Sequence, residues 1–157
     1  MENINNNYAN DTERVKEIFK KLHENMMEFP EVEFTRENYD KYLGNPIETP
    51  LGIVKMGGHQ FEKLEGKNRR HLIGAIAETL KKPGYICRDI DGKILFLKLF
   101  IRKNNPHNVV TVLIERDSLK ITVSAHDKRD NQIFDIITRA EPLEKFSPDH
   151  GTVHENV

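Results

Sequence analysis

Hydrophobic residues follow two different periods along this chain, and the change of period separates helical from extended segments. Residues 11–29 carry hydrophobic side chains three and four positions apart, which predicts an amphipathic helix that Pro30 ends. Residues 68–80 repeat this spacing behind a potential N-cap at Asn68. Residues 131–139 predict a shorter last helix.

Short hydrophobic segments separated by polar turns predict strands in the second half of the chain. These segments are residues 51–56, 85–90, 94–102, 109–115 and 119–126. Asp91-Gly92 stands between two of them, and this dipeptide is a strong signal for a β-hairpin. Because strands joined by tight turns pair antiparallel, we expect an α+β fold. It would have an antiparallel sheet of about four to five strands, helices packed on one face, and an additional N-terminal helix.

The composition of the chain changes at Thr49-Pro50, where a segment rich in Pro and acidic residues gives way to the predicted strands. We therefore predict three parts. Residues 1–48 form an N-terminal helical extension and linker, residues 49–140 form the core domain, and residues 141–157 form a C-terminal tail.

Residues 94–102 indicate what the two faces of the sheet present, because side chains alternate between the faces of a strand. One set is entirely aliphatic, and we expect it, with Leu97, to be buried beneath the helices. The other set places cations among apolar and aromatic side chains, namely Ile94, Phe96, Lys98, Phe100 and Arg102. We expect this second set to form a half-sheltered, positively charged groove around Lys98.

Residues 119–128 alternate in the same way. The aliphatic set includes Val123 and is expected in the core. The polar set is expected on the same side as Lys98 and consists of Lys120, Thr122, Ser124, His126 and Lys128. Hydroxyls, an imidazole and cations together can hold and cleave a phosphodiester. The alternative is an ordinary polar strand face in contact with solvent.

Two further positions could contribute to such a site. At 100° per residue, Arg69 projects within the hydrophobic arc of the helix predicted at 68–80, whereas Arg70 projects away from it. His59 follows the Gly57-Gly58 break after a predicted strand. The alternatives are that the Arg69 head group extends into solvent and that His59 is a surface loop residue.

The charge of the chain is unevenly distributed, although its net value is only −1. Residues 50–130 hold sixteen Lys/Arg against nine Asp/Glu, a net charge of +7, and both ends are acidic. A basic segment attracts polyanions through phosphate neutralisation and counterion release. The alternative is that these cations only solvate the surface.

Other signals narrow the class of protein. The single cysteine, Cys87, cannot form an internal disulfide, which favours a reducing compartment. No segment approaches a membrane span and the start lacks the pattern of a secretory signal, so we expect a soluble, cytoplasmic protein without membrane contact. His150 and His154 lie in the acidic tail without further ligands, and no cofactor motif is present. We therefore predict neither a metal nor a cofactor.

Several motifs within residues 49–140 resemble the phage- and prophage-encoded branch of the barnase–EndoU–colicin–RelE group of nucleases. They are the turn with Gly and His (MGGH), the helix RRHLIGAIAETLKKP, the strand KILFLKLFIRK with its embedded Lys, and the strand LKITVSAHDK with its hydroxyl residue. The resemblance implies a helix-plus-antiparallel-sheet fold and metal-independent cleavage of RNA, with tRNA among the candidate substrates. An inhibitor or a phage protein is the further partner that it implies. The matching positions are His59, Arg69 or Arg70, Lys98, Ser124 and His126.

These observations together predict a metal-independent ribonuclease that uses the 2′-hydroxyl of RNA as its nucleophile. His59 and His126 would share the acid and base roles, in an order that the sequence leaves open, because an imidazole can do either. Lys98 and Arg69 would hold the phosphate, and Ser124 would donate to a non-bridging oxygen. Further contacts to RNA are expected from Arg70, Phe96, Phe100, Arg102, Thr122 and Lys128.

Two other hypotheses remain open. In the first, the protein is a non-catalytic module, and its N-terminal helix docks on a phage or toxin-system protein. In the second, the sheet binds nucleic acid without cleaving it.

Overall fold

The computed structural model describes residues 2–44, 46–66, 68–116 and 119–143, without the side chains of residues 2–11, 116, 119 and 123. Five α-helices lie within this part of the chain: α1 (Glu2–Glu24), α2 (Arg36–Tyr39), α3 (Gln60–Gly66), α4 (Ile73–Lys81) and α5 (Asp130–Arg139). A π-helical turn (Asp40–Gly44) follows α2, and a 3₁₀ turn (Arg70–Leu72) precedes α4. Among the described residues, no helix combines the length and hydrophobicity needed to cross a membrane.

The strands found in the described residues are eight in number and form one sheet. They are β1 (Met27–Glu28), β2 (Ile47–Thr49), β3 (Gly52–Met56), β4 (Tyr85–Arg88), β5 (Ile94–Arg102), β6 (Asn105–Arg116), β7 (Leu119–Lys128) and β8 (Glu141–Pro142). Their order is β2-β3-β7-β6-β5-β4-β8, and β1 pairs with β5 beyond the end of β4.

The sheet is mixed, so the prediction of four to five antiparallel strands was wrong. β1 runs parallel to β5, and β3 runs parallel to β7, whereas the other pairs are antiparallel. The strands that the sequence did not indicate, β1, β2 and β8, have two or three residues each, too few to show a period of two. The barnase-like architecture implied by the resemblance is therefore not the fold of this chain.

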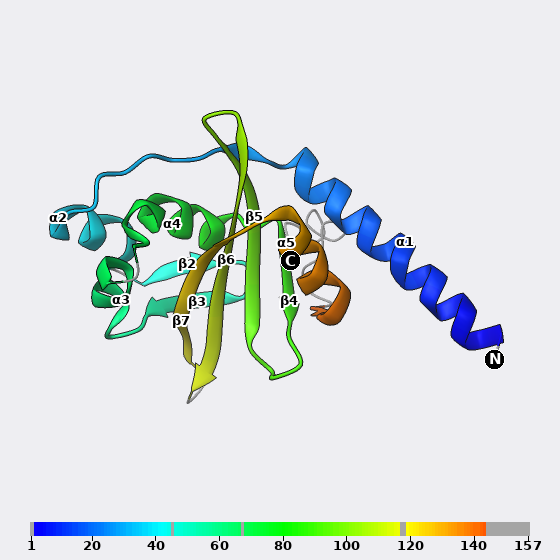
Figure 1. Cartoon of the computed structure of the whole chain (residues 1–157). Helices are drawn as coiled ribbons and strands as arrows, with labels where there is room; N and C mark the ends of the chain where they lie inside the picture. The colour runs from blue at the N-terminus through cyan, green and yellow to red at the C-terminus, as the bar shows by residue number, and fades with distance from the viewer. Residues whose placement is uncertain (1, 45, 67, 117–118, 144–157) are drawn as a thin grey trace.

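Helices cover both faces of the sheet, and not one face as predicted (Figure 1). The sheet curls so that β2 and β3 run across the direction of β5 and β6, and α4 packs against strands of both groups (Figure 1). We call this side the α4 face. The opposite side, on which α1 and α5 pack, is called the α5 face.

Strand β5 is buried on both of its faces, which explains its almost continuous hydrophobic sequence. Leu95, Leu97 and Leu99 pack with α1 and α5, as predicted for the aliphatic set. Phe96 and Phe100 pack with α4 on the other side and are fully buried, so the predicted half-sheltered groove is absent there. The alternation of Leu97 and Lys98 between faces is confirmed, but both faces are core.

Strand β7 contains a β-bulge that the sequence pattern did not reveal. Ser124 pairs with Val112, while Thr122 pairs with the next residue, Leu113, so Val123 is an extra residue in β7. Thr122 and Ser124 therefore lie on opposite faces although they are two positions apart. The prediction that they share a face was wrong. The prediction that Val123 is buried concerns a side chain outside the described residues.

The second half of α1 belongs to the core. Val15, Ile18 and Leu22 are buried against β5 and α5. At Gly84, just before β4, an added Cβ atom would lie only 2.5 Å from Leu22 Cδ2. The absence of a side chain there lets the helix approach the sheet closely.

Candidate functional site

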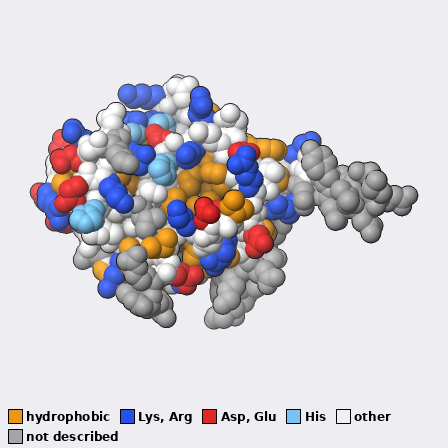
Figure 2. All heavy atoms as spheres, turned by 60° about the horizontal axis from the view of Figure 1, so that its bottom comes forward, with side chains coloured by type: hydrophobic (Ala, Val, Ile, Leu, Met, Phe, Trp, Pro, Cys, Tyr) orange, Lys and Arg blue, Asp and Glu red, His pale blue; other side chains and the backbone are white. Residues whose placement is uncertain are grey.

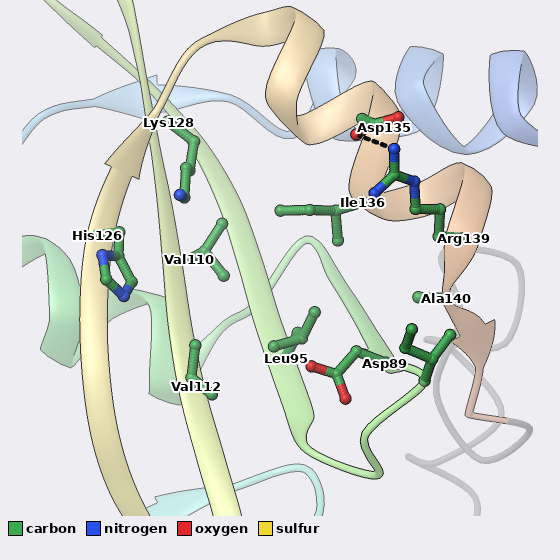
Figure 3. A pocket seen from close by; sticks show the side chains of 11 residues that line it. Asp89, Leu95, Val110, Val112, His126, Lys128, Asp135, Ile136, Arg139 and Ala140 are labelled. Carbon is green, nitrogen blue, oxygen red and sulfur yellow. Dashed lines mark ion pairs between the residues drawn. The ribbon is translucent and has the colours of Figure 1, made fainter.

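An open hollow of about 310 Å³ lies on the α5 face, between β5–β7, α5 and the turn that joins β4 to β5 (Figure 3). Figure 2 shows an apolar hollow near the middle of the molecular face, with basic side chains around it. We call the hollow on the α5 face the α5 groove. Its aliphatic floor is made by Leu95, Val110, Val112 and Ile136. Its polar rim is made by Asp89, His126, Lys128, Asp135 and Arg139.

The groove combines an apolar surface with basic groups, because three elements meet there. β7 places His126 and Lys128 on the same side of the sheet, beside the floor residues of β6 (Figure 3). Arg139 of α5 forms an ion pair of 3.2 Å with Asp135, one turn earlier. Ile90, in the β4–β5 turn, is 86% exposed at the edge of the groove. The arrangement suits a partly apolar ligand that also carries polar or charged groups.

Strand register explains which of the predicted β7 residues come together. Leu97 pairs with Val110, which pairs with His126, and paired residues share a face. The polar residues Ser124, His126 and Lys128 therefore lie on the face of Leu97, and Lys98 lies on the opposite face. The predicted common site is thus divided between the two sides of the sheet.

Lys98, in β5, caps the C-terminus of helix α4, and its ammonium is not directed into the α5 groove. Its side chain is buried, and Nζ donates a hydrogen bond of 2.6 Å to the backbone carbonyl of Lys82, at the C-terminus of α4. Burial lowers the pKa of the Lys98 ammonium, while the nearby Glu78 carboxylate opposes this effect. Because a helix C-terminus carries partial negative charge, a cation here stabilises the helix. The expected phosphate-binding role does not fit this position.

Three other predicted RNA contacts are also inaccessible. Phe96 and Phe100 are fully buried against α4 and cannot stack on a base. Thr122 is buried on the α4 face, where its hydroxyl accepts a hydrogen bond of 3.2 Å from the Gly57 amide. These residues support the core and the β3–β7 pairing.

The remaining predicted cations and His59 lie outside the α5 groove. His59 is exposed in the loop between β3 and α3. Arg69 and Arg70 lie at the start of the 3₁₀ turn before α4. Arg102 forms a bidentate pair with Glu31, at 2.8 and 3.1 Å, and lies 4.9 Å from the centre of the Phe29 ring.

A second polar cluster, which the sequence analysis did not identify, lies at the end of the α4 face. His71 Nε2 and His107 Nε2 lie 3.1 and 2.7 Å from the same oxygen of Asp127, Oδ2. The hydrogen bond from His71 is the main cause that holds the pKa of Asp127 below its usual value, although partial burial opposes it. We call these three residues the His–Asp–His cluster.

One signal could have indicated part of this cluster. His107 and Asp127 lie near the ends of adjacent strands that the sequence predicted to form a hairpin, and a correct register places them diagonally on one face. The contribution of His71 depends on how α4 crosses the sheet, which periodicity does not determine.

Comparisons with models of known protein families, with curated proteins and with solved structures find no match for this chain.

Proposed function

We propose that this chain binds single-stranded RNA in the α5 groove. One base would lie on the aliphatic floor, and an adjoining phosphate would lie beside Lys128 and His126. The observation that carries this proposal is the hollow of about 310 Å³ in which an apolar floor adjoins two basic residues of β7. A hollow of this size is at the lower end of the range for small-ligand sites, roughly 300–1,000 Å³, and suits one nucleotide.

The chemistry of RNA matches both parts of the groove. Each base has a flat face that is desolvated readily, and single-stranded RNA exposes such faces. The net charge of +7 over residues 50–130 adds long-range attraction for phosphates. Asp89 and Asp135 on the rim limit this attraction and leave hydrogen-bond acceptors for the amino groups of bases.

Cleavage of the bound RNA is the second candidate, and the position of His126 favours it. An imidazole on the rim can accept the proton of a 2′-hydroxyl, whose oxygen then attacks the adjacent phosphorus, while Lys128 stabilises the negative charge that develops. Lys98 and Thr122 take no part, because they lie on the other face. The 5′-oxygen leaves with a proton from solvent or from a second group.

The structure weakens the hypothesis of a non-catalytic module that docks its N-terminal helix on another protein. Val15, Ile18 and Leu22, the side chains that would dock the N-terminal helix on another protein, are buried within the chain.

A binding experiment with a matched control tests the proposal. The anisotropy of a fluorescent ten-nucleotide RNA is titrated with the wild-type chain, with Lys128→Ala and with Lys55→Ala. Lys55 is an exposed lysine of β3, outside the groove, so both variants remove one cation from a strand of the same sheet. We expect Lys128→Ala to weaken binding about fivefold to tenfold, roughly 1 kcal/mol, and Lys55→Ala much less. Equal effects would contradict binding in the groove.

The same RNA tests for cleavage. Incubation with EDTA should yield fragments from ordinary RNA and none from RNA with a deoxy sugar at the cut position, because that sugar lacks the nucleophile. His126→Ala should abolish cutting, whereas His59→Ala should not. RNA that binds in the groove and stays intact would leave binding as the function and exclude cleavage.

A further inference from the structure

The His–Asp–His cluster presents three metal-ligand atoms at one point, on the side of β7 opposite to the α5 groove. His71, His107 and Asp127 can each direct one ligand atom so that all three lie within 4.8 Å of one another. We propose that this cluster binds one divalent transition-metal ion, with Zn²⁺ as the ion that its ligands suit best. This site is independent of RNA binding, because Asp127 faces away from His126 and Lys128 on the same strand.

The two distances from Asp127 to the imidazoles are close to those between the ligands of a metal centre. Ligands about 2.1 Å from a metal are separated by roughly 3.0–3.4 Å at octahedral or tetrahedral angles. The separations from Asp127 Oδ2 are 3.1 Å to His71 Nε2 and 2.7 Å to His107 Nε2. The first of these separations already lies in this range, and the second would reach it if His107 moved away from Asp127 by a few tenths of an ångström.

The backbone holds the three ligands in place. Val109 pairs with Asp127, and His107 lies two positions before Val109 on the same face, so two ligands stand on adjacent, hydrogen-bonded strands. His71 comes from the 3₁₀ turn that leads into α4, a helix with a largely buried sequence. Rigid elements of this kind position ligands more accurately than loops do.

An aromatic side chain packs against the imidazole rings. Phe29 is buried, and its ring centroid lies 4.8 Å from that of His107, 6.1 Å from that of His71 and 4.9 Å from Arg102 Cζ. Arg102 is held by Glu31 through two hydrogen bonds. The guanidinium charge is thereby partly neutralised, which reduces its repulsion of a cation at the cluster.

The ligand types select the class of ion. Two imidazoles and one carboxylate suit Zn²⁺, Fe²⁺, Co²⁺ or Ni²⁺, whereas Ca²⁺ and Mg²⁺ prefer sites made of oxygen ligands. The three side chains are 29%, 22% and 31% exposed, so the cluster lies close to solvent, although the His107 Nε2 atom itself is buried. In the absence of an ion, one oxygen of the Asp127 carboxylate lies close to Nε2 of both imidazoles, and a bound metal ion would take the place of these two contacts.

Calorimetric titration of the full chain with Zn²⁺ tests the proposal, and Co²⁺ provides a visible absorption spectrum. We expect one ion per chain with a micromolar or lower dissociation constant, and no saturable binding of Mg²⁺. Asp127→Asn, His71→Gln and His107→Gln should each weaken Zn²⁺ binding at least thirtyfold. His23→Gln is the matched control, because His23 also faces an aspartate, Asp130, at 4.0 Å and lies outside the cluster.

Two further measurements distinguish the cluster from the remaining histidines of the chain. His150→Gln/His154→Gln removes the histidines of residues 144–157 and should leave the affinity unchanged. In the NMR spectrum of the wild type, Co²⁺ should shift the ring signals of His71 and His107 more than those of any other histidine. This measurement does not depend on a variant that folds. The proposal is overturned if the wild type shows no saturable binding, if the tail variant abolishes binding, or if the cluster variants bind as the wild type does.

Discussion

At the residue scale, Lys98 is the clearest case of a buried charged group whose role is to donate a hydrogen bond to a backbone carbonyl. Its Nζ lies 2.6 Å from the Lys82 carbonyl, where α4 ends. The last carbonyls of a helix have no partner within the helix, and a buried one is costly unless another group donates to it. Phe96 and Phe100 on either side exclude water and leave the lysine as the available donor. The position of Lys98 between two phenylalanines, which suggested an active-site cation, therefore reflects the capping of α4.

Replacing Lys98 with methionine should destabilise the fold while retaining most of the side-chain volume. Lys98→Met removes the donor to Lys82, and we expect a loss of about 1–3 kcal/mol in the free energy of unfolding by urea. The control Lys55→Met, at an exposed strand position, should change it by less than about 0.5 kcal/mol. Similar values for the two variants would mean that the contact with Lys82 contributes nothing.

Cys87 gives a prediction that depends on pH. Burial is the main cause that raises the pKa of the Cys87 thiol from 9.0 to about 12, and the charge of Asp89 adds to it. Between these two pH values, the unfolded chain releases the thiol proton and the folded chain retains it. The contribution of the thiol to the free energy of unfolding is therefore fully present below pH 9 and is lost as the pH rises. From pH 9 to pH 10 we expect a loss of about 1 kcal/mol, given about 1.4 kcal/mol per unit of pKa.

Urea unfolding of Cys87→Ala over the same pH range is the comparison that isolates this effect. Burial also raises the pKa of Tyr85 from 10.0 to about 12, so a smaller decline as the pH approaches 10 should persist in the variant. A wild-type decline identical to that of Cys87→Ala would exclude the thiol as its source.

At the scale of elements, the hydrophobic pattern predicted the long segments and missed their connections. The predicted range 94–102 is the observed range of β5, and Gly92, with φ of 85°, makes the predicted turn. α1 starts earlier than predicted and ends at Glu24, before Pro30, because Met27 and Glu28 pair with β5 instead of continuing the helix. Such pairing is a tertiary effect, and local periodicity carries no information about it.

Helix α1 provides the test at this scale, because the sequence suggested an extension and the structure places residues 12–24 against the core. Leu22 is 1% exposed and packs beside Gly84, so Leu22→Ala should reduce the free energy of unfolding by about 2–4 kcal/mol. Lys16→Ala, on an exposed face of the same helix, should have little effect. If Leu22→Ala proves as mild as Lys16→Ala, α1 contributes little to the fold in solution.

At the scale of the whole molecule, the limits of the site prediction have a physical origin. His126, Lys128 and Ser124 were placed correctly on one face, since alternation within the end of β7 suffices for that. The prediction that they share a face of the sheet with Lys98 was wrong, because that face depends on the register between three strands. The α5 groove also needs α5 and the floor of β6, and no local pattern specifies how a helix leaves part of a sheet uncovered.

The charge distribution of the whole chain predicts how RNA binding responds to salt. If two or three phosphates contact the basic segment, the logarithm of the affinity should fall with the logarithm of the salt concentration with a slope of roughly −1.4 to −2.1. Anisotropy titrations between 50 and 300 mM KCl measure this slope. An RNA analogue with an uncharged backbone should show almost none, and a flat response of RNA itself would remove the electrostatic argument.

The bulge in β7 has a consequence for how the length of this chain can vary. Because Val123 is surplus to the ladder, its removal would leave Thr122 and Ser124 in regular alternation and opposite their present partners. A related chain one residue shorter could therefore retain both the α5 groove and the His–Asp–His cluster, with its alignment gap at this position. A deletion elsewhere in residues 124–128 would instead move the side chains on one side of the deletion to the opposite face. His126 or Lys128 would then change faces relative to Asp127, unless the bulge moved to compensate. Val123 is thus the position at which β7 can best tolerate a change in length.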